Sequence, residues 1–197
     1  MLLETYLALC VFTFTTSITP GPNNMMLLTS GVNFGFRRTI PHILGIEFGF
    51  GSLILLVGLG AGALLTAEPR LYLVLKIVGG AYLLWIAWKI ATSTRLSDGT
   101  SDAKPMRFDQ AALFQFVNPK AWIMAAGAVA AYQEPSAFIR DSLLICLAFM
   151  SVGIFCTAAW AAFGSGLKNW LEEPSRLRLF NITMAILLVA SMWPMLR

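Results

Sequence analysis

The sequence predicts an all-α integral membrane protein that forms one transmembrane domain over residues 1–197. Three observations support this class. The chain is 57% hydrophobic and only 12% charged, its mean hydropathy is +0.72, and residues 5–36 carry no charge. Soluble domains carry about 25% charged residues, and about 20 apolar residues in a helix cross the hydrocarbon core of a bilayer. The lipid bilayer is therefore the first partner that the sequence predicts.

The spacing of the charged residues predicts six transmembrane helices. Each expected span has about 20 residues or more, which is enough to cross a bilayer with some tilt. The six spans are expected at residues 5–29, 39–65, 71–90, 110–132, 137–165 and 177–196.

The longest polar segment, residues 92–109, divides the chain into a first half of three spans (1–91) and a second half of three spans (110–197). Halves with an odd number of spans cross the membrane in opposite directions, which is the topology of a 3+3 inverted repeat. Lysine and arginine are enriched in the odd-numbered connections, with nine against three on the other side. The positive-inside rule therefore predicts that residues 92–109 are cytoplasmic and that both termini are periplasmic or extracellular.

Composition argues against several classes of function. The net charge of +4 comes from scattered residues, so no nucleic acid is expected as a partner. Cys10, Cys146 and Cys156 all lie in apolar stretches without a CxxC pair, which argues against a disulfide framework, a metal site or a cofactor. Glu4 precedes the first apolar stretch and no basic residue does, so we expect a retained first span rather than a cleaved signal peptide.

The first span contains the most informative motif, Thr19-Pro20-Gly21-Pro22-Asn23-Asn24. Proline lacks an N–H and displaces the preceding turn of a helix, so this motif is expected to break the first helix. Unpaired backbone groups are tolerated at membrane depth only where protein buries them or where they line a polar cavity. Broken helices of this kind are typical of the substrate sites of transporters.

The broken helix offers partners for both charges of an amino acid. Pro20 and Pro22 are expected to free the carbonyls of Thr16 and Ile18, which can accept hydrogen bonds from an ammonium group. The amides near Asn23 begin a new helix, whose positive dipole end suits a carboxylate. The candidate substrate-binding residues of this segment are Thr19, Pro20, Gly21, Pro22, Asn23 and Asn24.

A second candidate break lies early in the fourth span, at residues 115–120 (QFVNPK). At 1.5 Å per residue, Pro22 and Asn118 lie roughly 20 Å and 14 Å from the charges on the cytoplasmic side. The two breaks are therefore expected to face each other in the inner half of the membrane. Gln115, Asn118 and Pro119 are the candidate binding residues here. The alternative for residues 118–120 is an ordinary helix start with Lys120 snorkelling inward.

Glu47 lies nine residues after Arg38, inside the second span. A carboxylate at the centre of a span costs about 2.5–3.5 kcal/mol, so an intramembrane acid is a candidate for function. Glu47 is expected either to carry a proton or to contact a substrate ammonium. His42, the only histidine, is a second candidate for proton coupling, with an ordinary interfacial position as the alternative.

Taken together, these motifs resemble the lysine exporter (LysE/RhtB) family of bacterial amino-acid exporters. The resemblance rests on residues 19–23 (TPGPN), 35–37 (GFR), 75–89 (LKIVGGAYLLWIAWK) and 116–121 (FVNPKA). It implies an inner-membrane secondary transporter that exports a small amino acid from the cytoplasm, driven by the proton gradient, and not an enzyme. Residues 87–93 (AWKIATS) and 115–118 (QFVN) are most similar to the cysteine and O-acetylserine exporters of that family; homoserine, threonine and lysine-like substrates are the other candidates.

The sequence departs from that subgroup at Glu47 and at Pro41-His42, which leaves the coupling scheme and the substrate open. Two other functions remain as alternatives, namely a membrane thiol–disulfide electron carrier and a membrane assembly partner that transports nothing. The apolar outer surfaces also permit a homodimer.

Overall fold

The computed structural model describes residues 1–62, 68–93 and 104–193. Within these ranges the chain forms helices joined by loops and contains no strand, which confirms the all-α class. The helices are α1 (Leu3–Ile18), α2 (Pro22–Phe34), α3 (Phe36–Leu56), η1 (Val57–Ala61), α5 (Pro69–Ala91), α6 (Phe108–Gln115), α7 (Pro119–Tyr132), η2 (Pro135–Ala137), α8 (Phe138–Leu167), η3 (Asn169–Glu172) and α9 (Pro174–Ala190).

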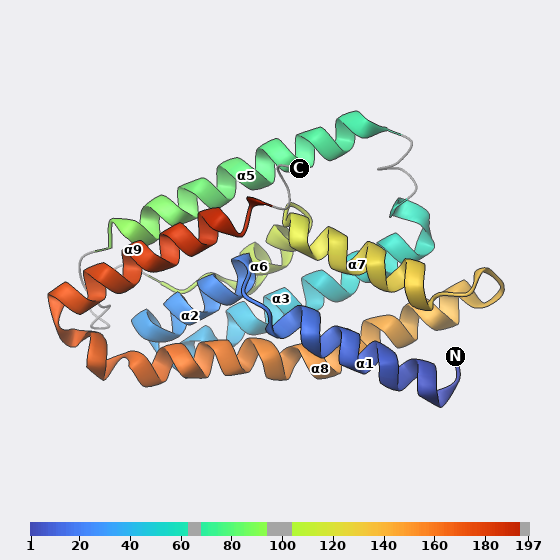
Figure 1. Cartoon of the computed structure of the whole chain (residues 1–197), viewed down its shortest axis with the longest axis horizontal. Coiled ribbons are helices and arrows are strands. Elements are labelled where there is room, and N and C mark those ends of the chain that lie inside the picture. Colours follow the sequence, from blue (N-terminus) through green and yellow to red (C-terminus); the bar gives the residue numbers. More distant parts are fainter. Residues whose placement is uncertain (63–67, 94–103, 194–197) are drawn as a thin grey trace.

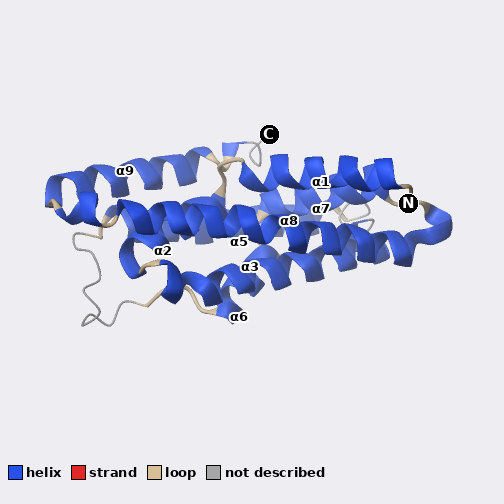
Figure 2. Cartoon of the chain, turned by 90° about the horizontal axis from the view of Figure 1, so that it is seen from below, coloured by secondary structure: helices blue, strands red, loops and turns tan. Residues whose placement is uncertain are grey.

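The helices form an elongated bundle in which most of them follow one long axis (Figure 1). The long helix α8 packs against α1, α2 and α3, and α5 packs along α9. Figure 2 shows the same bundle from below, with α9 and α1 towards opposite ends. Near the middle of the long axis, α1 gives way to α2 (Figure 1). The centre of the bundle is thus where the helices are interrupted.

Three helices of the described residues are long and apolar enough to cross a membrane: Phe36–Ala61, Leu73–Ala91 and Pro135–Leu167. They correspond to the second, third and fifth expected spans, and they support a multi-pass membrane protein. The expected first span consists of α1 and α2, the expected fourth span consists of α6 and α7, and the sixth contains α9. Each of these helices is too short to qualify alone, so the six-span inverted repeat stays a prediction.

Proline explains where the helices are interrupted. A residue that precedes proline is driven out of the α conformation. Thr19, Gly21 and Asn118 each precede a proline, and each has an extended backbone. Pro22 and Pro119 then begin α2 and α7, because the first turn of a helix needs no N–H from its first residue.

Several boundaries differ from those predicted. The helix of the second expected span, α3, begins at Phe36, directly after Gly35, whose φ of 77° is a backbone conformation that favours glycine. That helix passes into the π-helix η1, and residues 63–65 of the expected span lie outside the described residues. The last helix begins at Pro174 and ends at Ala190, and residues 194–196 are not described. The predicted polar connection includes the start of α6 at Phe108, and residues 94–103 are not described.

Glycine allows α2 and α8 to approach until their backbones touch. A Cβ atom added to Gly31 would collide with the carbonyl oxygen of Ala161, and one added to Gly164 would collide with the carbonyl oxygen of Leu28. Both obstacles are backbone atoms, which cannot rotate away as a side chain can. Small residues at helix contacts are typical of membrane proteins, and here they fix the spacing of the two helices.

Gly31→Ala and Gly164→Ala are each expected to destabilise the protein by about 1–3 kcal/mol, because overpacking forces the backbone to shift. The measurement is thermal unfolding of the purified protein in detergent. Gly166→Ala is the matched control in α8, because a Cβ there meets nothing within 4 Å. If all three variants unfold alike, the α2–α8 contact is looser than described.

Candidate functional site

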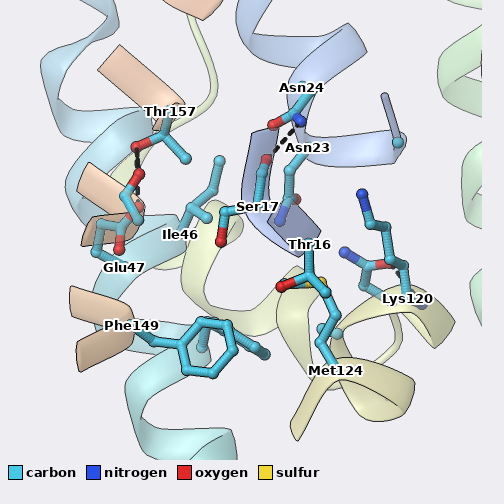
Figure 3. A pocket seen from close by; sticks show the side chains of 15 residues that line it. Thr16, Ser17, Asn23, Asn24, Ile46, Glu47, Lys120, Met124, Phe149 and Thr157 are labelled. Atoms are coloured by element: carbon cyan, nitrogen blue, oxygen red, sulfur yellow. Dashed lines mark hydrogen bonds between the residues drawn. The ribbon is translucent and has the colours of Figure 1, made fainter. Parts of the chain in front are cut away.

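A small pocket lies where the α1–α2 junction meets α3, α7 and α8 (Figure 3). Its volume is about 50 Å³, which is room for a few water molecules. Its apolar lining consists of Ile46, Phe50, Met124 and Phe149. Its polar lining consists mainly of Asn23, Asn24, Glu47, Asn118, Lys120 and Thr157, with Thr16 and Ser17 from the end of α1.

Donors from the protein itself satisfy the last carbonyls of α1. The buried Asn24 side chain donates from Nδ2 to Ser17 O at 2.9 Å and to Thr19 O at 2.8 Å. Trp160 of α8 donates from Nε1 to Ile18 O at 3.2 Å. Helix ends need such partners, because their last four carbonyls have none inside the helix. The break between α1 and α2 is therefore held by specific hydrogen bonds.

The carbonyls that the prolines were expected to free are occupied in this structure. Thr16 O accepts from Thr19 Oγ1 at 2.8 Å, and Ile18 O accepts from Trp160, as described above. In the second interruption, Gln115 O accepts from the backbone N–H of Asn118 at 3.3 Å. A ligand ammonium would have to compete with these internal donors.

Lys120 brings a positive charge to the end of α1. Its Nζ donates to Thr19 O at 2.8 Å, to Thr19 Oγ1 at 3.0 Å and to Pro20 O at 3.4 Å. A cation is stabilised at the C-terminal end of a helix, where the dipole is negative. The side chain of Lys120 thus joins the start of α7 to the interruption after α1.

Amide side chains connect the two interruptions directly. Asn23 donates from Nδ2 to Gln115 Oε1 at 2.8 Å, and Gln115 donates from Nε2 to Asn23 Oδ1 at 3.1 Å. Gln115 is fully buried, and its Nε2 also donates to Ala111 O at 2.9 Å. Asn118 caps α7 by accepting from the N–H of Lys120 at 3.2 Å. The segments that the sequence predicts to face each other are thus in contact, 92 residues apart in the chain.

Glu47 lies on the opposite side of the pocket from Lys120 (Figure 3). It is 5% exposed, and its Oε1 accepts from Thr157 Oγ1 of α8 at 2.8 Å. Gly153 makes room for the other oxygen, because a Cβ at that position would lie 2.9 Å from Glu47 Oε2. The described part of the chain places no cation within ion-pair distance of this carboxyl group.

His42 is buried inside the bundle, away from the pocket. It is 1% exposed and does not line the pocket. Neither ring nitrogen has a hydrogen-bond partner among the described residues. The structure thus places Glu47 in the pocket and His42 outside it, although both were predicted as candidates for proton coupling.

Four of the nine predicted binding residues line this pocket. Gly21, Asn23, Asn24 and Asn118 line it, and Gln115 supports it through Asn23. Thr19 and Pro20 do not line it but accept hydrogen bonds from Lys120, which does, while Pro22 and Pro119 begin α2 and α7.

Sequence reasoning missed Lys120, Thr157, Gly153 and the two phenylalanines of the lining. A signal existed for Lys120, since an ionisable residue within an apolar segment is a candidate for function by default.

The fold and the pocket define a helical membrane protein with a polar site at interrupted helices, the plan of a transporter. The family model described as "LysE type translocator" matches residues 14–191. The cysteine/O-acetylserine efflux proteins of Escherichia coli strain K12 and of Shigella flexneri are each 33% identical over 187 residues, with 92% of both chains covered. The protein belongs to the LysE translocator family, which makes it a transporter rather than an enzyme. No solved structure matches it.

Proposed function

We propose that this protein is a secondary transporter of the inner membrane that exports a small amino acid or amino-acid derivative by proton antiport. Cysteine and O-acetylserine are the first candidates, because the relatives with the corresponding name are 33% identical over nearly the whole chain. The observation that carries the proposal is the pocket itself: it lies between two interrupted helices and has an acid on one side and a lysine on the other. Homoserine, threonine and lysine-like substrates follow as further candidates.

Transport requires the pocket to open. Pockets that hold small ligands measure about 300 Å³ or more, whereas this one measures about 50 Å³. The helices must therefore separate before a substrate enters. The two interruptions are the natural points for this movement, because they lack continuous helical hydrogen bonding. We propose that they open alternately to the cytoplasm, where residues 92–109 are expected, and to the side of both termini.

Glu47 can couple the two fluxes by binding two cations in turn. A carboxylate that holds a proton cannot at the same time pair with an ammonium group. If substrate from the cytoplasm displaces the proton from Glu47, and a proton from outside later displaces the substrate, the two move in opposite directions. The isolated position of Glu47, with Thr157 as its only hydrogen-bond partner in the described chain, supports this role.

Export is tested in cells that lack related exporters. The medium is analysed for all amino acids and their acetyl derivatives, with and without the protein. The proposal expects one or a few species to rise only in cells that express it. If no species rises, the protein is either a non-transporting assembly partner or carries a substrate outside the amino acids.

Gly153→Ala is expected to reduce the export rate several-fold, because the new methyl group would push the carboxyl group of Glu47 out of its position between α3 and α8. The measurement is export per molecule of protein in the membrane. Gly127→Ala in α7 is the control, since a Cβ there makes ordinary contact with Phe12 at 3.8 Å. An unchanged rate in Gly153→Ala would argue against a role for Glu47 in its observed position.

A further inference from the structure

The ammonium group of Lys120 is bound only by neutral acceptors. All three of its partners belong to Thr19 and Pro20, and no carboxylate lies within ion-pair distance of it in the described part of the chain. A half-buried ammonium with such partners gains less than it would from an anion, because an anion adds direct Coulomb attraction, which is stronger in a partly buried site than in water. The site is therefore better suited to an anion than to its present partners.

The side chain of Lys120 lies across the interruption between α1 and α2. A Cβ at Gly21 would be 2.7 Å from Lys120 Cδ and 3.0 Å from its Nζ. The absence of a side chain at position 21 is what lets the lysine reach Thr19 along this path. Lys120 therefore occupies a groove that the break itself creates.

Across the pocket, Glu47 is an unpaired acid in the same cavity (Figure 3). An acid on one side and an ammonium on the other match the two charges of a zwitterion. Phe50 and Phe149 line the same space and offer apolar contact to a short side chain. Electrostatic matching of this kind favours molecules that carry both charges over those that carry one.

We propose that Lys120 is the group that recognises the carboxylate of the substrate, and that its ammonium leaves the carbonyls of Thr19 and Pro20 when it does so. This inference rests on the proposed function and names the ligand group that Lys120 selects. The exchange replaces neutral acceptors with a charged one. It also breaks the hydrogen bonds by which Lys120 connects α7 to the end of α1. Substrate binding thereby loosens the interruption that must open.

The test compares L-cysteine with cysteamine, which is the same molecule without the carboxylate. Purified protein is reconstituted into liposomes under reducing conditions, and the uptake of each labelled compound by counterflow is measured. Wild type is expected to prefer cysteine by about 10- to 100-fold, the effect of a charge-assisted hydrogen bond. Lys120→Gln is expected to lose most of this preference, chiefly through slower transport of cysteine.

Two further variants separate recognition from support of the fold. Lys120→Arg keeps the charge and is expected to keep the preference for cysteine. Lys89→Gln changes a lysine of α5 that lies over the ring of Trp85 and does not line the pocket, so it should behave as wild type. Thermal unfolding of each variant in detergent shows whether the protein is folded.

The outcomes are distinct. A Lys120→Gln protein that loses cysteine and cysteamine transport equally would show that Lys120 only braces the helices, and an unchanged preference would show that it does not contact the carboxylate. If Lys120→Gln does not fold, loss of the preference in a folded Lys120→Arg protein would likewise overturn the proposal. If wild type transports neither compound, the proposed function fails for this substrate and the inference fails with it.

Discussion

Glu47→Gln is expected to abolish the response of export to a proton gradient while leaving the protein folded. The glutamine side chain has nearly the same shape, and its carbonyl oxygen can still accept from the hydroxyl of Thr157. It cannot bind and release a proton, and it cannot form an ion pair with an ammonium group. Loss of a hydrogen bond to a charged group costs about 1.5–3 kcal/mol, so substrate affinity is also expected to fall by roughly 10- to 100-fold.

The measurement is efflux of labelled cysteine from liposomes with and without an imposed pH gradient. Wild type should accelerate when the gradient is imposed, and Glu47→Gln should show the same slow rate in both conditions. Glu4→Gln is the control, because Glu4 lies in the first turn of α1, is exposed and does not line the pocket. A Glu47→Gln protein that still accelerates in the gradient would remove Glu47 from coupling.

The second large effect is expected at the amide pair of Asn23 and Gln115. Gln115→Leu removes the partner of Asn23 and leaves its partly buried amide unsatisfied, which costs less than the about 1–3 kcal/mol of a fully buried group. Asn23→Leu removes the same contact from the other side, although Gln115 keeps its hydrogen bond to Ala111 O. The double variant loses this contact only once, so its destabilisation is expected to be smaller than the sum of the two single effects.

Unfolding of the wild type, the two single variants and the double variant in detergent gives the interaction energy of the amide pair. The export rate of each protein shows whether the same interaction affects transport. Comparing export by the wild type with export by the double variant tests whether this contact holds the two interruptions together or only fills space. Additive effects would mean that the two amides act independently, in spite of the 2.8 Å and 3.1 Å hydrogen bonds between them.

The sequence was sufficient to predict where the helices are interrupted. Proline lacks an N–H wherever it occurs, so its positions in the sequence predict an interruption at residues 19–22. Counting residues from the nearest charges predicts that Pro22 and Asn118 lie in the same half of the membrane, and the structure brings their segments into contact. The intramembrane position of Glu47 could also be predicted, because an acid in an apolar stretch stands out without any knowledge of packing.

The direction in which each side chain points could not be predicted. Spacing along a helix gives depth, but the rotation of one helix against its neighbour depends on packing between segments that lie far apart in the chain. Lys120 shows this best: its place beside the second interruption is plain from the sequence, while its contact with Thr19, 101 residues away, was missed. The contacts of Glu47 with Gly153 and Thr157 were missed for the same reason.

The occupied carbonyls of α1 have a consequence for ion leak. Sodium and potassium bind to clusters of oxygen atoms, and a helix end with free carbonyls at membrane depth would offer such a cage. In this protein the hydroxyl of Thr19, the indole of Trp160, the amide of Asn24 and the ammonium of Lys120 already fill those positions. We therefore expect the substrate-free protein to be impermeable to alkali ions, so that it does not dissipate the membrane potential.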